Sequence, residues 1–156
     1  TSAMHARFAD EKERLFRELA TRLDPLPGLM DLLALADERG IAVGLVTNAP
    51  RANAEHMLAA LGLAERFTVR VLGEEVARAK PDPLPYATAV ARLGVRPDEA
   101  IGFEDSVSGV RSASAAGLLT VGIATSQTPA TLTEAGARHV VADFADPIVR
   151  RLVERS

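Results

Sequence analysis

Polar side chains of several kinds follow three separate apolar segments of this sequence. Thr47 and Asn48 end the first segment, and Lys80 lies in the loop after the second. Glu104 and Asp105 end the third. A hard cation such as Mg²⁺ takes carboxylate oxygens, whereas an ammonium group and a hydroxyl group bind phosphate oxygens. Together these residue types predict a site for Mg²⁺ and a phosphate group, provided that the fold brings them together.

The segments that carry these residues alternate between short apolar runs and longer runs of helical period. The run 41–47 is almost wholly apolar and rich in β-branched residues, which is typical of a strand buried on both faces in a parallel sheet. Further strands are predicted at 68–72, 101–103, 119–123 and 139–141, and helices at 6–23, 29–39, 51–61, 82–93, 106–116, 131–135 and from 146. Strands that alternate with helices form βαβ units with right-handed crossovers. We therefore expect a three-layer α/β/α, Rossmann-like, doubly wound parallel sheet.

The expected sheet determines where the polar residues meet. In an open parallel sheet, ligands bind outside the carboxyl ends of the strands, so Thr47, Lys80 and Glu104 are expected along one edge. Asn48 also starts the turn into the next helix, whose free N–H groups point toward an anion. Arg70 within the run 68–72 favours an edge position for that strand.

Composition excludes several classes of function. The chain has 156 residues, 47% of them apolar, which suits one globular domain. Its net charge is −3 and it has no Trp and only one Tyr, so neither the basic excess nor the stacking aromatics of a nucleic-acid binder are present. It has no Cys, which excludes disulfides and thiolate metal sites. No apolar run is long enough for a membrane span and no signal segment opens the chain, so we expect a cytoplasmic protein.

Three motifs carry a resemblance to a known family. Residues 46–50 (VTNAP), 80–83 (KPDP) and 102–109 (GFEDSVSG) resemble, in order and spacing, the second, third and fourth motifs of the haloacid dehalogenase-like hydrolases. The subgroup that they most resemble is the β-phosphoglucomutase and phosphoglycolate phosphatase type. The resemblance runs from about residue 12 to residue 141. Each motif alone is a weak signal, whereas three in register on matching strands are specific.

The resemblance implies a role for each residue. Thr47 and the backbone amide of Asn48 would hold the transferring phosphoryl group, and Lys80 would neutralise it. Asp105 would ligate Mg²⁺, and Glu104 would ligate it or orient its waters. The implied activity is that of a Mg²⁺-dependent phosphatase or phosphomutase that acts on a small phosphorylated metabolite through an aspartyl phosphate.

The sequence departs from the family at the first motif. No two aspartates are separated by one residue, so the Asp-x-Asp pair that supplies the family's nucleophile is missing. In the family, the strand that bears this pair lies between the strands that end here in Thr47 and Glu104. Because the first residue is Thr1, we expect an upstream portion to hold that strand and most of the helical cap. Residues 1–24 are then a remnant of the cap and 25–156 the core domain, and the chain alone is expected to be inactive.

Other interpretations stay open on the sequence alone. A degenerate relative that binds a phosphorylated ligand or a protein partner without catalysis would keep the same motifs. A phospho-acceptor signalling domain of flavodoxin-like type has similar chemistry, but it needs an acidic pair at the end of its first strand. Taken singly, Thr47 is an ordinary strand end, and Glu104 with Asp105 is an ordinary helix start.

Overall fold

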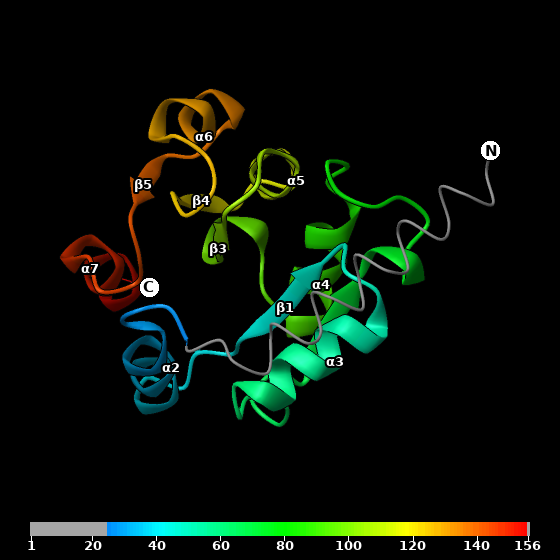
Figure 1. Cartoon of the computed structure of the whole chain (residues 1–156), viewed down its shortest axis with the longest axis horizontal. Coiled ribbons are helices and arrows are strands. Elements are labelled where there is room, and N and C mark those ends of the chain that lie inside the picture. Colours follow the sequence, from blue (N-terminus) through cyan, green and yellow to red (C-terminus); the bar gives the residue numbers. More distant parts are fainter. Residues whose placement is uncertain (1–24, 156) are drawn as a thin grey trace.

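The computed structural model describes residues 25–155, in which short strands alternate with helices (Figure 1). The strands are β1 (Gly44–Thr47), β2 (Val69–Leu72), β3 (Ile101–Glu104), β4 (Leu119–Ile123) and β5 (His139–Val141). The helices are α2 (Leu29–Glu38), α3 (Arg51–Ala60), α4 (Leu84–Leu93), α5 (Val107–Ala115), α6 (Pro129–Ala135) and α7 (Pro147–Glu154), with short 3₁₀ helices η1 (Gly73–Glu75) and η2 (Pro97–Glu99). The predicted helix 6–23 and the proposed cap remnant 1–24 lie outside the described residues.

Local capping chemistry sets several helix boundaries. Ser106 precedes α5, and its side chain accepts a hydrogen bond from the backbone N–H of Gly109. Helix α4 begins at Leu84, within the predicted range 82–93, and Asp82 just before it accepts the N–H of Leu84 through Oδ1. Gly40, which follows α2, has a φ of +65°, a conformation that glycine adopts without a Cβ clash.

The strands form two parallel groups. Strand β1 pairs with β2, from Gly44 opposite Val69 to Thr47 opposite Leu72. The other group has the order β3-β4-β5, and both of its pairings are parallel. Within residues 25–155, β2 pairs with β1 alone, which agrees with the edge position that Arg70 predicted. The predicted α/β class is confirmed.

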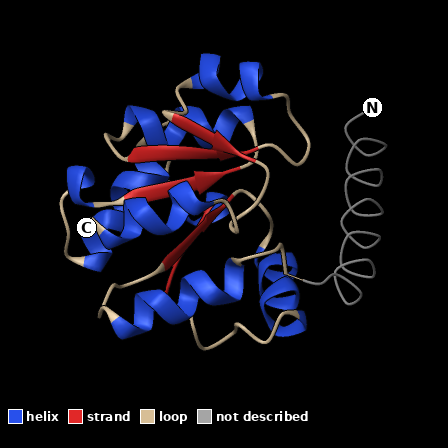
Figure 2. Cartoon of the chain, turned by 90° about the vertical axis from the view of Figure 1, so that its left-hand side faces the viewer, coloured by secondary structure: helices blue, strands red, loops and turns tan. Residues whose placement is uncertain are grey.

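Helices pack on both faces of the strands (Figure 2). Neighbouring side chains of β1 point to opposite layers, since Leu45 packs with a cluster that joins α2 and α3, whereas Val46 packs with a cluster that joins α4 and α5. Around β4, Val121 and Val149 of α7 are fully buried in a third cluster. The three-layer prediction therefore describes the arrangement of these elements. Within residues 25–155, no helix has the length and apolar character needed to cross a membrane.

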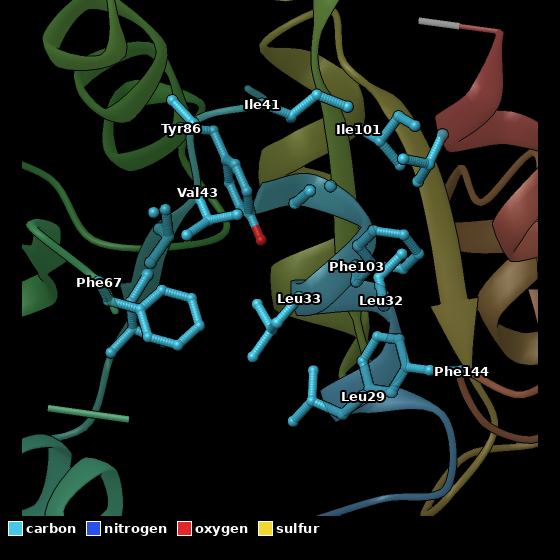
Figure 3. Close-up of a pocket in the computed structure, with 17 residues that line it drawn as sticks. Leu29, Leu32, Leu33, Ile41, Val43, Phe67, Tyr86, Ile101, Phe103 and Phe144 are labelled. Atoms are coloured by element: carbon cyan, nitrogen blue, oxygen red, sulfur yellow. The ribbon is translucent and has the colours of Figure 1, made fainter. Parts of the chain in front are cut away.

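A slot separates β1 from β3. No hydrogen-bonded ladder joins these two strands in the described part of the chain. On the α2 side the slot is a cavity of about 310 Å³, and on the α4 side it continues into one of about 430 Å³. Tyr86 lines both cavities and lies between Val43 and Phe103 in Figure 3. Other apolar residues that line the first cavity include Leu29, Leu32, Leu33, Ile41, Phe67, Ile101 and Phe144.

The slot corrects one prediction made from sequence. The run 41–47 was expected to form one strand buried on both faces, but β1 begins only at Gly44 and none of its residues is fully buried. Strand β1 is short and partly exposed because the described chain supplies no neighbouring strand on the side toward β3 to pair with it or to cover it.

Candidate active site

Lys80 connects the carboxyl ends of β1 and β3. Its Nζ donates hydrogen bonds to the backbone oxygen of Val46, over 3.2 Å, and to Glu104 Oε1, over 2.7 Å. Both side chains are largely buried, with exposed fractions of 8% for Lys80 and 7% for Glu104. The structure therefore brings Lys80 and Glu104 together at the sheet edge where sequence reasoning expected them, across the open end of the slot.

Asn48 holds the main chain of Lys80. Its Nδ2 donates to the carbonyl oxygen of Lys80 over 3.2 Å, and its Oδ1 accepts the N–H of Lys80 over 3.3 Å. The loop that carries Gly73 lies close by, because a Cβ on Gly73 would sit 2.8 Å from Asn48 Oδ1. Asn48 thus fixes the backbone of Lys80 from β1, while Val46 and Glu104 fix its ammonium group.

Thr47 lies at the end of β1, where α3 begins shortly afterwards. Its hydroxyl oxygen accepts the N–H of Ala49 over 3.0 Å. At the start of α3, the backbone N–H of Arg51 donates to Glu74 Oε1 over 3.0 Å, and its guanidinium group pairs with Glu75. Arg51 is therefore engaged with acidic residues of η1, whereas the hydroxyl hydrogen of Thr47 stays available to an acceptor.

Glu104 has a second donor that sequence reasoning missed. The hydroxyl group of Tyr86, on α4, donates to Glu104 Oε1 over 2.6 Å. Burial raises the pKa of Tyr86 well above its usual value, and the negative charge of Glu104 adds to this effect, so the phenol stays protonated and donates. Tyr86 is the only tyrosine of the chain, and a tyrosine on the buried face of a helix needs a partner for its hydroxyl group, which was the available signal.

The carboxylate of Glu104 also touches the first turn of α5. A Cβ on Gly109 would overlap both carboxylate oxygens, so this position accommodates only glycine while Glu104 keeps its place. Within residues 25–155, the side chain of Glu104 makes both of its hydrogen bonds through Oε1. Its other oxygen, Oε2, accepts no hydrogen bond from this described part of the chain.

Asp105 completes the acidic pair at the end of β3. It is exposed, and its side chain has no hydrogen bond or ion pair with the described residues. Those residues contain no cluster of three or more His, Cys, Asp or Glu side chains that is able to hold a metal ion. Mg²⁺ is commonly bound through one or two carboxylates, with water and substrate phosphate as its other ligands. Glu104 and Asp105 therefore fit such an ion as a partial donor set.

The comparisons with known proteins agree with these motifs. Residues 3–117 match the family model for haloacid dehalogenase-like hydrolases. The chain is 39% identical over 108 residues to validoxylamine A 7'-phosphate phosphatase of Streptomyces hygroscopicus subsp. limoneus, a match that covers 69% of the chain and 51% of that relative. It is 37% identical over 119 residues to phosphoglycolate phosphatase of Rhodospirillum rubrum, covering 76% and 49%. The chain spans about half the length of the curated relatives it matches.

The solved structures show the same fold. CbbY from Rhodobacter sphaeroides, in complex with phosphate, superposes with a TM-score of 0.76 at 30% identity, covering 90% of this chain and 64% of that one. The matching family model covers well over half of the chain, and the resemblance to the β-phosphoglucomutase and phosphoglycolate phosphatase subgroup is confirmed. The chain therefore belongs to the haloacid dehalogenase-like hydrolases.

Proposed function

We propose that this chain is the core of a Mg²⁺-dependent phosphatase or phosphomutase that acts on a small phosphorylated metabolite. The observation that carries this proposal is the contact between Lys80 Nζ and Glu104 Oε1, which joins the cationic and acidic motifs at one sheet edge. The names of the relatives add support, since they include phosphatases of phosphorylated carbohydrates and of phosphoglycolate. One structural relative is described in complex with phosphate.

The phosphate group would be held by three groups of this chain. The ammonium group of Lys80 has three hydrogens, and two of them serve Val46 and Glu104, which leaves the third for a phosphoryl oxygen. The hydroxyl group of Thr47 would donate a second hydrogen bond. The side chain of Asn48 is occupied by Lys80, so its contribution would come from the backbone amide that the resemblance implies.

The metal would be held by Asp105 and Glu104. Asp105 would ligate it, and Glu104 Oε2 would ligate it or orient its waters, since Oε1 already accepts two hydrogen bonds. When bound, Mg²⁺ supplies positive charge that offsets the developing charge on the phosphoryl oxygens.

We place the missing nucleophile on a strand that fills the slot between β1 and β3. The slot supports this proposal because its walls are apolar, both flanking strands lack a partner there among residues 25–155, and Lys80 stands at its carboxyl end. An aspartate at the end of such a strand would attack phosphorus while the bond to the ester oxygen breaks and that oxygen takes a proton. Water would then hydrolyse the aspartyl phosphate, release phosphate and restore the carboxylate.

One observation favours a second candidate. The sequence holds no Asp-x-Asp pair, and a chain without that nucleophile would bind a phosphorylated ligand without turning it over. This non-catalytic module would use Thr47, Lys80 and the acidic pair for binding alone.

A phosphatase assay with p-nitrophenyl phosphate separates the candidates. We expect the 156-residue chain to show no Mg²⁺-dependent turnover, and a longer form that adds a strand ending in Asp-x-Asp to show turnover that Asp105→Ala abolishes. An inactive longer form that still binds phosphate would favour the module. Mg²⁺-dependent turnover by the 156-residue chain, lost in Asp105→Ala, would contradict the assignment of the nucleophile to another segment.

A further inference from the structure

We propose that Tyr86 is a positioning residue: its hydroxyl group fixes the plane of the Glu104 carboxylate, so that one oxygen takes both donors and the other is left for the ligand. This inference rests on the proposed function for the role of Glu104, but its geometry stands on contacts within the chain. Tyr86 acts through Glu104 and contacts neither the metal nor the phosphate in this scheme.

Lys80 and Tyr86 donate hydrogen bonds to the same carboxylate oxygen of Glu104. Lys80 Nζ and Tyr86 Oη donate to Glu104 Oε1 over 2.7 and 2.6 Å. Tyr86 is only 6% exposed, so water has little access to replace its hydrogen bond. Lys80 brings a positive charge, whereas the phenol is neutral and leaves the charge of the carboxylate for a cation.

The backbone of α5 also confines the Glu104 carboxylate. The carboxylate rests on Gly109 in the first turn of α5, where a Cβ would overlap Oε2 most closely and Oε1 as well. The ring of Tyr86 is itself fixed, because it packs in a cluster with Val90, Ala113 and Leu118. Two donors to Oε1 and the backbone at Gly109 therefore confine the Glu104 carboxylate.

Removal of the hydroxyl group leaves Lys80 as the single donor to Glu104 among residues 25–155. With one donor in place of two, the plane of the carboxylate is less fixed, so neither oxygen keeps a set direction toward the ligand. Loss of a group that orients a metal ligand typically weakens metal binding by about tenfold or more. We therefore expect Tyr86→Phe to raise the Kd for a divalent ion by about tenfold.

Tyr86→Phe keeps the ring and removes only the hydroxyl group, which favours a folded variant. Thr120→Val is the matched control, because Thr120 is also buried and its hydroxyl group donates to the backbone oxygen of Leu118 over 3.2 Å, in β4 and away from the site. Crystal structures without metal would report the place of Glu104 in each variant. Titration with Mn²⁺, followed by electron paramagnetic resonance, would report metal binding.

The proposal predicts a turned or disordered Glu104 carboxylate in Tyr86→Phe, a Kd for Mn²⁺ about tenfold higher, and wild-type behaviour in Thr120→Val. A Glu104 carboxylate that keeps its place in Tyr86→Phe would overturn the proposal. So would Mn²⁺ binding as tight as in the wild type. If Glu104 turns but the wild-type chain binds no Mn²⁺, the positioning by Tyr86 stands and the proposed metal site fails.

Discussion

Replacing Lys80 with Met removes the cation that pairs with Glu104 while it keeps a side chain of similar length. Glu104 is 7% exposed, so Lys80→Met leaves a buried carboxylate whose only side-chain donor within residues 25–155 is Tyr86. A hydrogen bond to a charged group contributes about 1.5–3 kcal/mol, and breaking a buried ion pair costs about 3–5 kcal/mol. Because the slot beside the pair is open, we expect a loss of about 3 kcal/mol in the free energy of unfolding, at the lower end of that range.

Urea denaturation followed by circular dichroism measures this loss. Glu104→Gln in the Lys80→Met background removes the uncompensated charge, and we expect it to restore more than half of the lost stability. Arg78→Met is the matched control, because Arg78 pairs with Asp82 in the same loop but is 66% exposed, and such exposed pairs contribute little to stability. A Lys80→Met variant within about 0.5 kcal/mol of the wild type would refute the reasoning, since the contact would then be screened like the control.

Two further substitutions test the contacts around this pair. Gly109→Ala adds a Cβ that overlaps the Glu104 carboxylate. We expect this variant to lower the free energy of unfolding by about 1–3 kcal/mol and to displace Glu104 in a crystal structure. An unmoved Glu104 would contradict this expectation. Asn48→Ala removes both hydrogen bonds to the Lys80 main chain. We expect phosphate binding, measured by ³¹P NMR, to weaken about tenfold. Unchanged binding would show that Lys80 is positioned without Asn48.

Local signals made much of the fold predictable from sequence. Ser106 caps α5, and the sequence signals this cap because a serine before a helical run satisfies a free N–H of the first turn. Arg70 indicated an edge strand because a long charged side chain needs solvent or carbonyl oxygens, and its guanidinium group donates to the carbonyl oxygen of Phe67. Both features depend on residues within a few positions of each other.

Features that depend on distant neighbours were not predictable in the same way. The run 41–47 has the composition of a central strand, but its pairing depends on whether a neighbour lies beside it, and composition does not report this. The contact of Tyr86 with Glu104 joins residues 18 positions apart and depends on the rotation of α4 against β3. The amide of Asn48 reaches Lys80 across 32 positions, and this contact depends on how the loop after η1 folds back onto the end of β1.

A crystal structure of the chain grown with Mg²⁺ and phosphate tests the central claim most directly. We expect phosphate beside the hydroxyl group of Thr47 and the ammonium group of Lys80, with the metal on Asp105 at the carboxyl end of the slot. Phosphate bound on another face of the molecule, or a metal that contacts neither Asp105 nor Glu104, would contradict the account.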